Sequence, residues 1–115
     1  MLALILVLLL CACTPQVASY RGPMREVWGQ KTWWAVEDSA QGFLITVEHN
    51  GDFGSGLAAT AAACKSALLS QASAYADSRG KKIQPINEQR ITMSVGYRGL
   101  APGCLGQVPV EWQWK

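Results

Sequence analysis

The sequence predicts an α+β fold in which one long helix covers one face of a four-stranded antiparallel sheet, in the order β-β-α-β-β. Two pairs of segments with alternating apolar side chains flank a single Ala-rich segment that carries an apolar stripe at helical spacing. Turn sequences separate the two members of each pair. Consecutive strands joined by short turns pair antiparallel, so the two halves of the sheet are hairpins. Which strands are neighbours in the middle of the sheet stays open.

The first hairpin is predicted from residues 26–37 and 43–49, with a turn over 38–42. The earlier segment is rich in β-forming residues, and one of its faces carries Trp28, Trp34 and Val36. The later segment alternates, with one apolar face formed by Phe43, Ile45 and Val47.

The helix is predicted from Leu57 to about Ser78, because this Ala-rich stretch contains neither Gly nor Pro. Ser55 is predicted as the N-cap, and Gly80 as the left-handed residue after the C-terminus. The apolar stripe that should face the sheet consists of Ala61, Cys64, Leu68, Ala72 and Tyr75.

The second hairpin is predicted from residues 90–97 and 108–115, with a Gly/Pro turn region over 98–104. Residues 82–87 are expected to be extended or irregular, because Pro85 cannot donate a ladder hydrogen bond. The last strand should place its apolar side chains on one face, namely Val108, Val110, Trp112 and Trp114.

The N-terminal residues indicate a location for the protein. The apolar run Leu2–Leu10 is too short to span a bilayer and has the length of the apolar region of a secretory signal. The tetrapeptide Leu10-Cys11-Ala12-Cys13 resembles the lipobox of bacterial lipoproteins, with Leu at −3, a small residue at −1 and the Cys that is acylated. An ordinary cleaved signal and a buried N-terminal strand are the alternatives.

This resemblance covers four residues and implies a processing class, without a fold or an activity. It implies a signal peptide at 1–12, a lipidated N-terminus and tether at 13–24, and one α+β domain at 25–115. The lipid would be carried by Cys13. Because Thr14 follows instead of Asp, the resemblance implies the outer membrane of the bacterial cell envelope, with the domain facing the periplasm.

The other two cysteines, Cys64 and Cys104, are then an even remainder in an exported chain, which predicts a disulfide between them. This bond would join the helix to the loop between the last two strands. Two distant cysteines and a single histidine make a poor metal site, so no metal or other cofactor is expected.

Composition and motifs argue against several classes of function. Ten basic and eight acidic residues are interspersed along the chain, and the formal charge of +2 argues against a nucleic-acid partner. Any general base would have to be His49, the only histidine, and no Gly-x-Ser-x-Gly nucleophile motif occurs. We therefore expect that the protein is not an enzyme.

The five tryptophans are the strongest hint of a binding surface. Trp33 and Trp34 are neighbours, so they point to opposite faces of a strand. If Trp34 lies in the core, Trp33 is a candidate partner surface on the open face, unless the tether or residues 83–89 fold over it.

The leading expectation is a lipid-anchored envelope protein without enzymatic activity, whose domain binds another envelope protein, for example as an inhibitor or immunity protein. A module that binds a small molecule or glycan on an exposed aromatic sheet face is the alternative.

Overall fold

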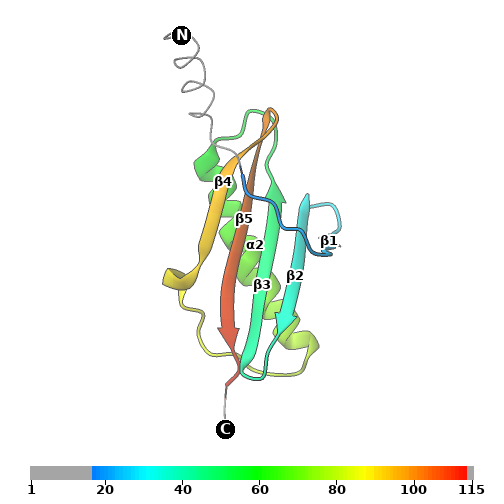
Figure 1. Ribbon diagram of the computed structural model, residues 1–115, viewed down its shortest axis with the longest axis vertical. Coiled ribbons are helices and arrows are strands. Elements are labelled where there is room, and N and C mark those ends of the chain that lie inside the picture. The colour runs from blue at the N-terminus through cyan, green and yellow to red at the C-terminus, as the bar shows by residue number, and fades with distance from the viewer. Residues whose placement is uncertain (1–16, 114–115) are drawn as a thin grey trace, which may run out of the picture.

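The computed structural model describes residues 17–113, so the predicted lipidation at Cys13 and the predicted position of Trp114 lie outside the described residues. The predicted α+β architecture is confirmed: one helix packs on one face of an antiparallel sheet (Figure 1). The sheet has five strands in the order β1-β2-β3-β5-β4, so the predicted number of four is wrong. The elements are β1 (Arg25–Val27), β2 (Thr32–Asp38), β3 (Gly42–Asn50), α2 (Leu57–Ser78), the 3₁₀ turn η1 (Glu88–Arg90), β4 (Thr92–Arg98) and β5 (Ala101–Glu111).

The additional strand arises because the segment predicted as one strand, 26–37, folds back on itself. Gly29 and Lys31 adopt left-handed backbone angles, with φ of 77° and 51°, and the chain turns between β1 and β2. β1 then pairs antiparallel with the first three residues of β2. Trp28 consequently lies in the turn and is 91% exposed, instead of sharing a face with Trp34 and Val36.

The second hairpin turns more tightly than predicted. Gly99 takes a φ of 66°, so two residues are enough to connect β4 to β5, and β5 starts at Ala101. Cys104 therefore lies within β5, opposite Val95 of β4 and His49 of β3, and not in a loop. The predicted Cys64–Cys104 disulfide is present, with 6.3 Å between the two Cα atoms, and it joins α2 to the central strand β5.

The helix has the predicted bounds, and its buried side chains recur at every fourth residue: Thr60, Cys64, Leu68, Ala72 and Ala76. The predicted members Ala61 and Tyr75 lie beside this row and are half-buried. The N-cap is Gly56, which makes no side-chain capping bond, so the predicted N-cap Ser55 is wrong. Gly80 has the predicted left-handed conformation, with φ of 65°.

The core lies between α2 and the two central strands. Gly106 of β5 lets the helix come close to the sheet: a Cβ built on Gly106 would lie 3.5 Å from Leu68 of α2. Phe43 packs against Tyr75 and Trp112, with ring centroids 4.8 and 5.1 Å apart. The core side chains of the sheet are Phe43, Ile45, Val47, Val108, Val110 and Trp112. Among the described residues, no helix is both long and apolar enough to cross a membrane.

Candidate functional site

Segment 17–24, which precedes β1, crosses the sheet face that lies opposite the helix (Figure 1). Its backbone is held at Ala18, whose N–H donates to Ser94 Oγ at 2.9 Å and whose carbonyl oxygen accepts from Arg98 Nη2 at 3.2 Å. Much of the segment predicted as a tether therefore lies against the sheet.

Arg98 is itself fixed by two side chains of β3. Its guanidinium forms an ion pair with Glu48 at 2.7 Å and donates to Asn50 Oδ1 at 2.7 Å. To reach β3 it passes over Gly103 of β5, where an added Cβ would lie 2.7 Å from Nη1. The absence of a side chain at Gly103 thus makes room for the cation that holds Ala18.

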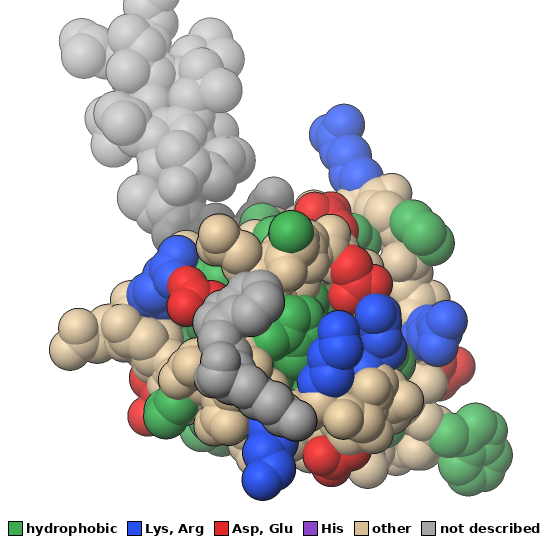
Figure 2. Space-filling model, turned by 90° about the horizontal axis from the view of Figure 1, so that it is seen from below, with side chains coloured by type: hydrophobic (Ala, Val, Ile, Leu, Met, Phe, Trp, Pro, Cys, Tyr) green, Lys and Arg blue, Asp and Glu red, His purple; other side chains and the backbone are tan. Residues whose placement is uncertain are grey.

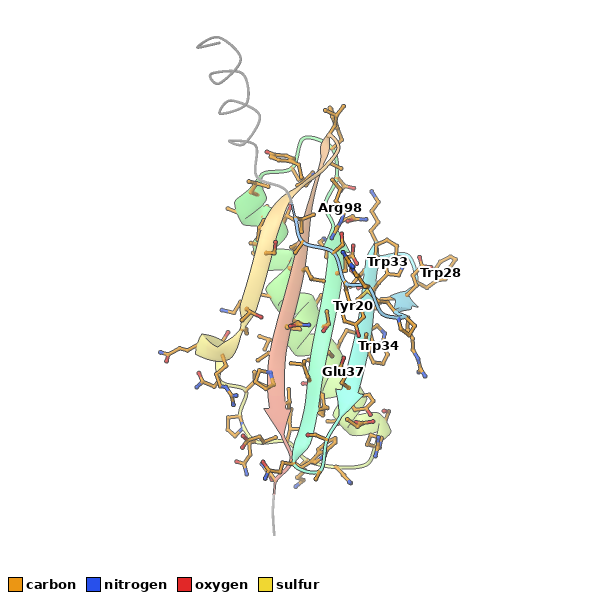
Figure 3. All side chains as sticks on the ribbon, in the orientation of Figure 1. Tyr20, Trp28, Trp33, Trp34, Glu37 and Arg98 are labelled. Carbon is orange, nitrogen blue, oxygen red and sulfur yellow. A yellow bond between two sulfur atoms is a disulfide. The ribbon has the colours of Figure 1, made fainter. Side chains whose placement is uncertain are left out.

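Trp33 lies on this open face, opposite Glu26 of β1 and Glu48 of β3 in the strand pairing. The indole is half-buried. Figure 3 shows Tyr20 of the crossing segment on the same side of the sheet. Trp34 points to the other side, where it packs edge-on against Tyr75 with ring centroids 6.2 Å apart. The predicted division of the two tryptophans between the faces is therefore confirmed.

Among residues 17–113, no strand lies on the outer side of half of β2. Hydrogen bonds from Asn50 N to Lys31 O and from Ser39 N to Gly42 O show that the odd-numbered residues of β2 direct their backbone groups to β3. The even-numbered residues therefore point outward. Within residues 17–113, β1 pairs only with Thr32–Trp34, so the outward N–H and C=O groups of Val36 and Asp38 have no ladder partner.

Pro23 explains why β1 is so short. The register of β1 on β2 would place Pro23 opposite Val36, and proline has no N–H to donate. The chain instead leaves the edge and turns onto the open face. A proline just ahead of a predicted strand is visible in the sequence, but the register that sets it against Val36 depends on pairing that the sequence does not reveal.

A groove of about 650 Å³ follows this free edge. Its helix side is formed by Trp34 and Tyr75, and its open side by Tyr20, Pro23 and Glu37. Arg25, also in its lining, lies with its guanidinium carbon 5.7 Å from the centre of the Trp34 ring. The groove is therefore largely aromatic on the side of the helix.

The helix-side wall of the groove is anchored by Asp38. The Tyr75 hydroxyl donates to Asp38 Oδ1 at 2.6 Å, and Arg79 donates to Asp38 Oδ2 at 3.3 Å. Burial and the bond to Asp38 raise the pKa of Tyr75, so the phenol keeps its proton at neutral pH. Glu37, by contrast, is exposed, and no cation within residues 17–113 forms an ion pair with it. Glu37 therefore offers an unpaired carboxylate on the open side of the groove, while the guanidinium of Arg25 lies at Trp34.

A second cavity, of about 330 Å³, lies near the N-terminus of α2 and contains His49. The Thr32 hydroxyl donates to Gln30 O at 2.9 Å, so at its other contact, also 2.9 Å, it accepts from His49 Nδ1. This leaves the lone pair on Nε2. Burial lowers the pKa of His49, and the imidazole is neutral at pH 7.

The surroundings of His49 do not assemble a catalytic triad. The nearby carboxylate Asp52 is held by Lys31 at 2.6 Å, and among the described side chains only Thr32 hydrogen bonds to the His49 ring. No group of three or more His, Cys, Asp or Glu side chains in residues 17–113 is arranged to hold a metal ion. The chain matches no protein-family model, no curated protein and no solved structure.

Proposed function

We propose that this protein is a lipid-anchored protein of the bacterial cell envelope, without enzymatic activity, whose domain binds an extended segment of a partner protein along the free edge of β2. The observation that carries the proposal is that, within residues 17–113, half of β2 has no strand partner on its outer side and its residues Val36 and Asp38 line a groove. An inhibitor or immunity protein directed at an envelope-attacking enzyme is one form of this function. The anchor is the lipid on Cys13.

Strand addition suits this edge because the backbone supplies affinity and alternate side chains supply specificity. Val36 and Asp38 offer two outward N–H and two outward C=O groups. A peptide strand paired with them would direct alternate side chains to opposite sides of the sheet. One set meets the aromatic wall of Trp34 and Tyr75, and the other meets Glu37.

The partner segment is therefore expected to alternate apolar and basic residues. Apolar side chains bury against the aromatic wall, and Lys or Arg compensates the carboxylate of Glu37. Figure 2 shows basic and acidic side chains mixed at the end of the domain where the β2–β3 turn lies, so this end offers no extended field of one sign. Shape and backbone pairing, more than net charge, would select the partner.

Photocrosslinking tests the binding surface. A benzophenone amino acid is placed at Glu37 in the full-length, membrane-anchored protein, and the matched control carries it at Thr92. Both residues are exposed and lie on the open face of outer strands, at opposite edges of the sheet. A discrete adduct at position 37 and none at position 92 is expected. Equal adducts at both positions, or none at position 37, would contradict the proposal.

The anchor is tested separately. Cys13→Ser should move the protein from the membrane fraction to the supernatant and abolish labelling with a fatty-acid probe. If membrane association and labelling persist in this variant, Cys13 is not the anchor.

The alternative, a module that binds a glycan or small molecule on the aromatic sheet face, has one observation in its favour. Tyr20 and Trp33 lie on the same open side of the sheet, where an aromatic pair could stack on a sugar (Figure 3). Titration of the tryptophan fluorescence with envelope glycan fragments distinguishes the two functions. A saturable change that Trp33→Ala abolishes would favour the glycan module over strand addition.

A further inference from the structure

We infer that the domain rests on the lipid bilayer with one defined end, formed by the β3–α2 loop (51–56) and the β4–β5 turn (99–100). This inference rests on the proposed function, because it takes Cys13 as the acylated residue. The partner is a lipid surface, and two exposed apolar side chains at this end of the domain would contact it.

The length of chain between the anchor and the sheet restricts which end can face the membrane. Cys13 and Ala18 are five positions apart in the sequence, and a fully extended chain of that length spans at most about 18 Å. Ala18 is bound by Ser94 and Arg98 of β4, which lie six and two residues before Leu100 at the tip of the β4–β5 turn. The acyl chains are therefore tethered to the half of the sheet nearer this turn.

The opposite end of the domain lies too far away. Leu105 of β5, which is opposite Ser94, lies six residues, or about 20 Å, from Glu111 at the end that carries the β2–β3 turn. Figure 1 shows the two ends at the extremes of the long axis, with segment 17–24 entering nearer the end that carries the β4–β5 turn. With the long axis of the domain upright on the bilayer, the chain between Ala18 and Cys13 is therefore too short for the β2–β3 turn to face the membrane.

The end near the anchor exposes two large apolar side chains. Phe53 in the β3–α2 loop is 79% exposed, and Leu100 at the tip of the β4–β5 turn is 80% exposed. A hydrogen bond from Gly51 N to Pro102 O, 2.8 Å long, holds the two loops side by side. Transfer of apolar side chains at loop tips from water into the headgroup region lowers the free energy.

The charges around these loops are compatible with an anionic bilayer. Asp52, the neighbour of Phe53, forms an ion pair with Lys31 at 2.6 Å, and this contact lowers the pKa of the Asp52 carboxyl group.

The only other strongly exposed large apolar side chain among the described residues, Trp28, projects from the β1–β2 turn at the side of the sheet (Figure 3). Phe53 and Leu100 therefore form the apolar pair at the end nearest the anchor.

The orientation is tested with a fluorescent label on single introduced cysteines at Phe53, Leu100, Ala40 and Thr92. Cys64 and Cys104 are joined to each other, and acylation occupies Cys13, so in the processed protein the introduced thiol is the one available for labelling. The acylated full-length protein is inserted into vesicles of phosphatidylethanolamine and phosphatidylglycerol, with or without headgroup-nitroxide lipid as the quencher.

Labels at 53 and 100 are expected to lose more than half of their fluorescence to the nitroxide lipid. The control label at Ala40, exposed in the β2–β3 turn, should lose almost none. Stronger quenching at Ala40 would overturn the inference, and stronger quenching at Thr92 would show that the open sheet face lies on the bilayer instead.

Mass analysis of the N-terminal peptide distinguishes a failure of the proposed anchor from a failure of the proposed orientation. Protein that carries no acyl group at Cys13 and stays in the supernatant refutes the proposed anchor, and the orientation with it. Acylated, vesicle-bound protein whose labels at 53 and 100 are both unquenched refutes the orientation alone.

Discussion

Reduction of the Cys64–Cys104 disulfide is expected to lower the free energy of unfolding by about 4 kcal/mol. The bond closes a loop of 40 residues, which contains about the last two thirds of α2, all of β4 and the start of β5. The loop-closure relation gives about 13 cal/mol/K for such a loop, or about 4 kcal/mol at 25 °C. A domain of this size is stable by roughly 5–15 kcal/mol, so the bond carries a large share of the total.

Urea unfolding of the Cys13→Ser variant, with and without a reductant, measures this effect without a lipid. With a slope of about 1.5 kcal/mol per M, the loss corresponds to a midpoint lower by about 2.7 M. Cys64 and Cys104 are fully buried, which limits access of the reductant to the bond. The state of the disulfide is therefore verified by mass in each sample before unfolding. A midpoint shift below about 0.7 M would refute the loop-closure argument.

Three further perturbations follow from single contacts. Gly42→Ala should lower the free energy of unfolding by about 2–3 kcal/mol, because the added Cβ would overlap the carbonyl oxygen of Val110. Gly56→Ser meets open space and should raise it by a few tenths of a kcal/mol, because the serine side chain can cap α2. Equal urea midpoints for the two variants would contradict this prediction. Arg98→Ala should speed hydrogen exchange at the Ala18 N–H at least about tenfold, because it removes the donor to the Ala18 carbonyl oxygen and loosens segment 17–24. An unchanged exchange rate would show that other contacts hold this segment. Because the pKa of His49 is lowered in the fold, the unfolded chain binds the proton more readily, so stability should fall as the pH drops through about 6.5 and below. His49→Gln should remove this part of the pH dependence in urea midpoints measured from about pH 8 to pH 5. Equal pH dependence in the two proteins would contradict this prediction.

The helix could be predicted to both ends because its signals are local. Gly56 and Gly80 bracket an Ala-rich stretch, and Gly80 closes the C-terminus with bonds from Gly80 N to Asp77 O and from Lys81 N to Ala76 O. The alternating faces of β3 and β5 were predictable for the same reason. The row of buried helix residues moved by one position at each end, and the N-cap is Gly56 instead of Ser55.

The strands at the edges could not be predicted as well, because their limits depend on single backbone angles and on pairing. Gly29 inside a β-rich segment is a visible warning of a break, but the left-handed Lys31 that completes the turn is not. Pro102 and Gly103 resemble a turn in sequence, yet they lie in β5 because Gly99 alone closes the hairpin. The free half of β2, and with it the candidate groove, follows from such long-range pairing.

Segment 17–24 connects the two proposals, because it holds the anchor near one end of the sheet and also forms a wall of the groove. Ala18 is bound at β4, while Tyr20 and Pro23 line the groove at β2. Val36 pairs with Ile45, which lies five residues, or about 17 Å, along β3 from its end at the β3–α2 loop. If that loop lies on the lipid, a partner segment in the groove is held within roughly 20 Å of the same bilayer. This proximity favours a partner that is itself anchored in, or lies on, that membrane over one that diffuses freely in the periplasm.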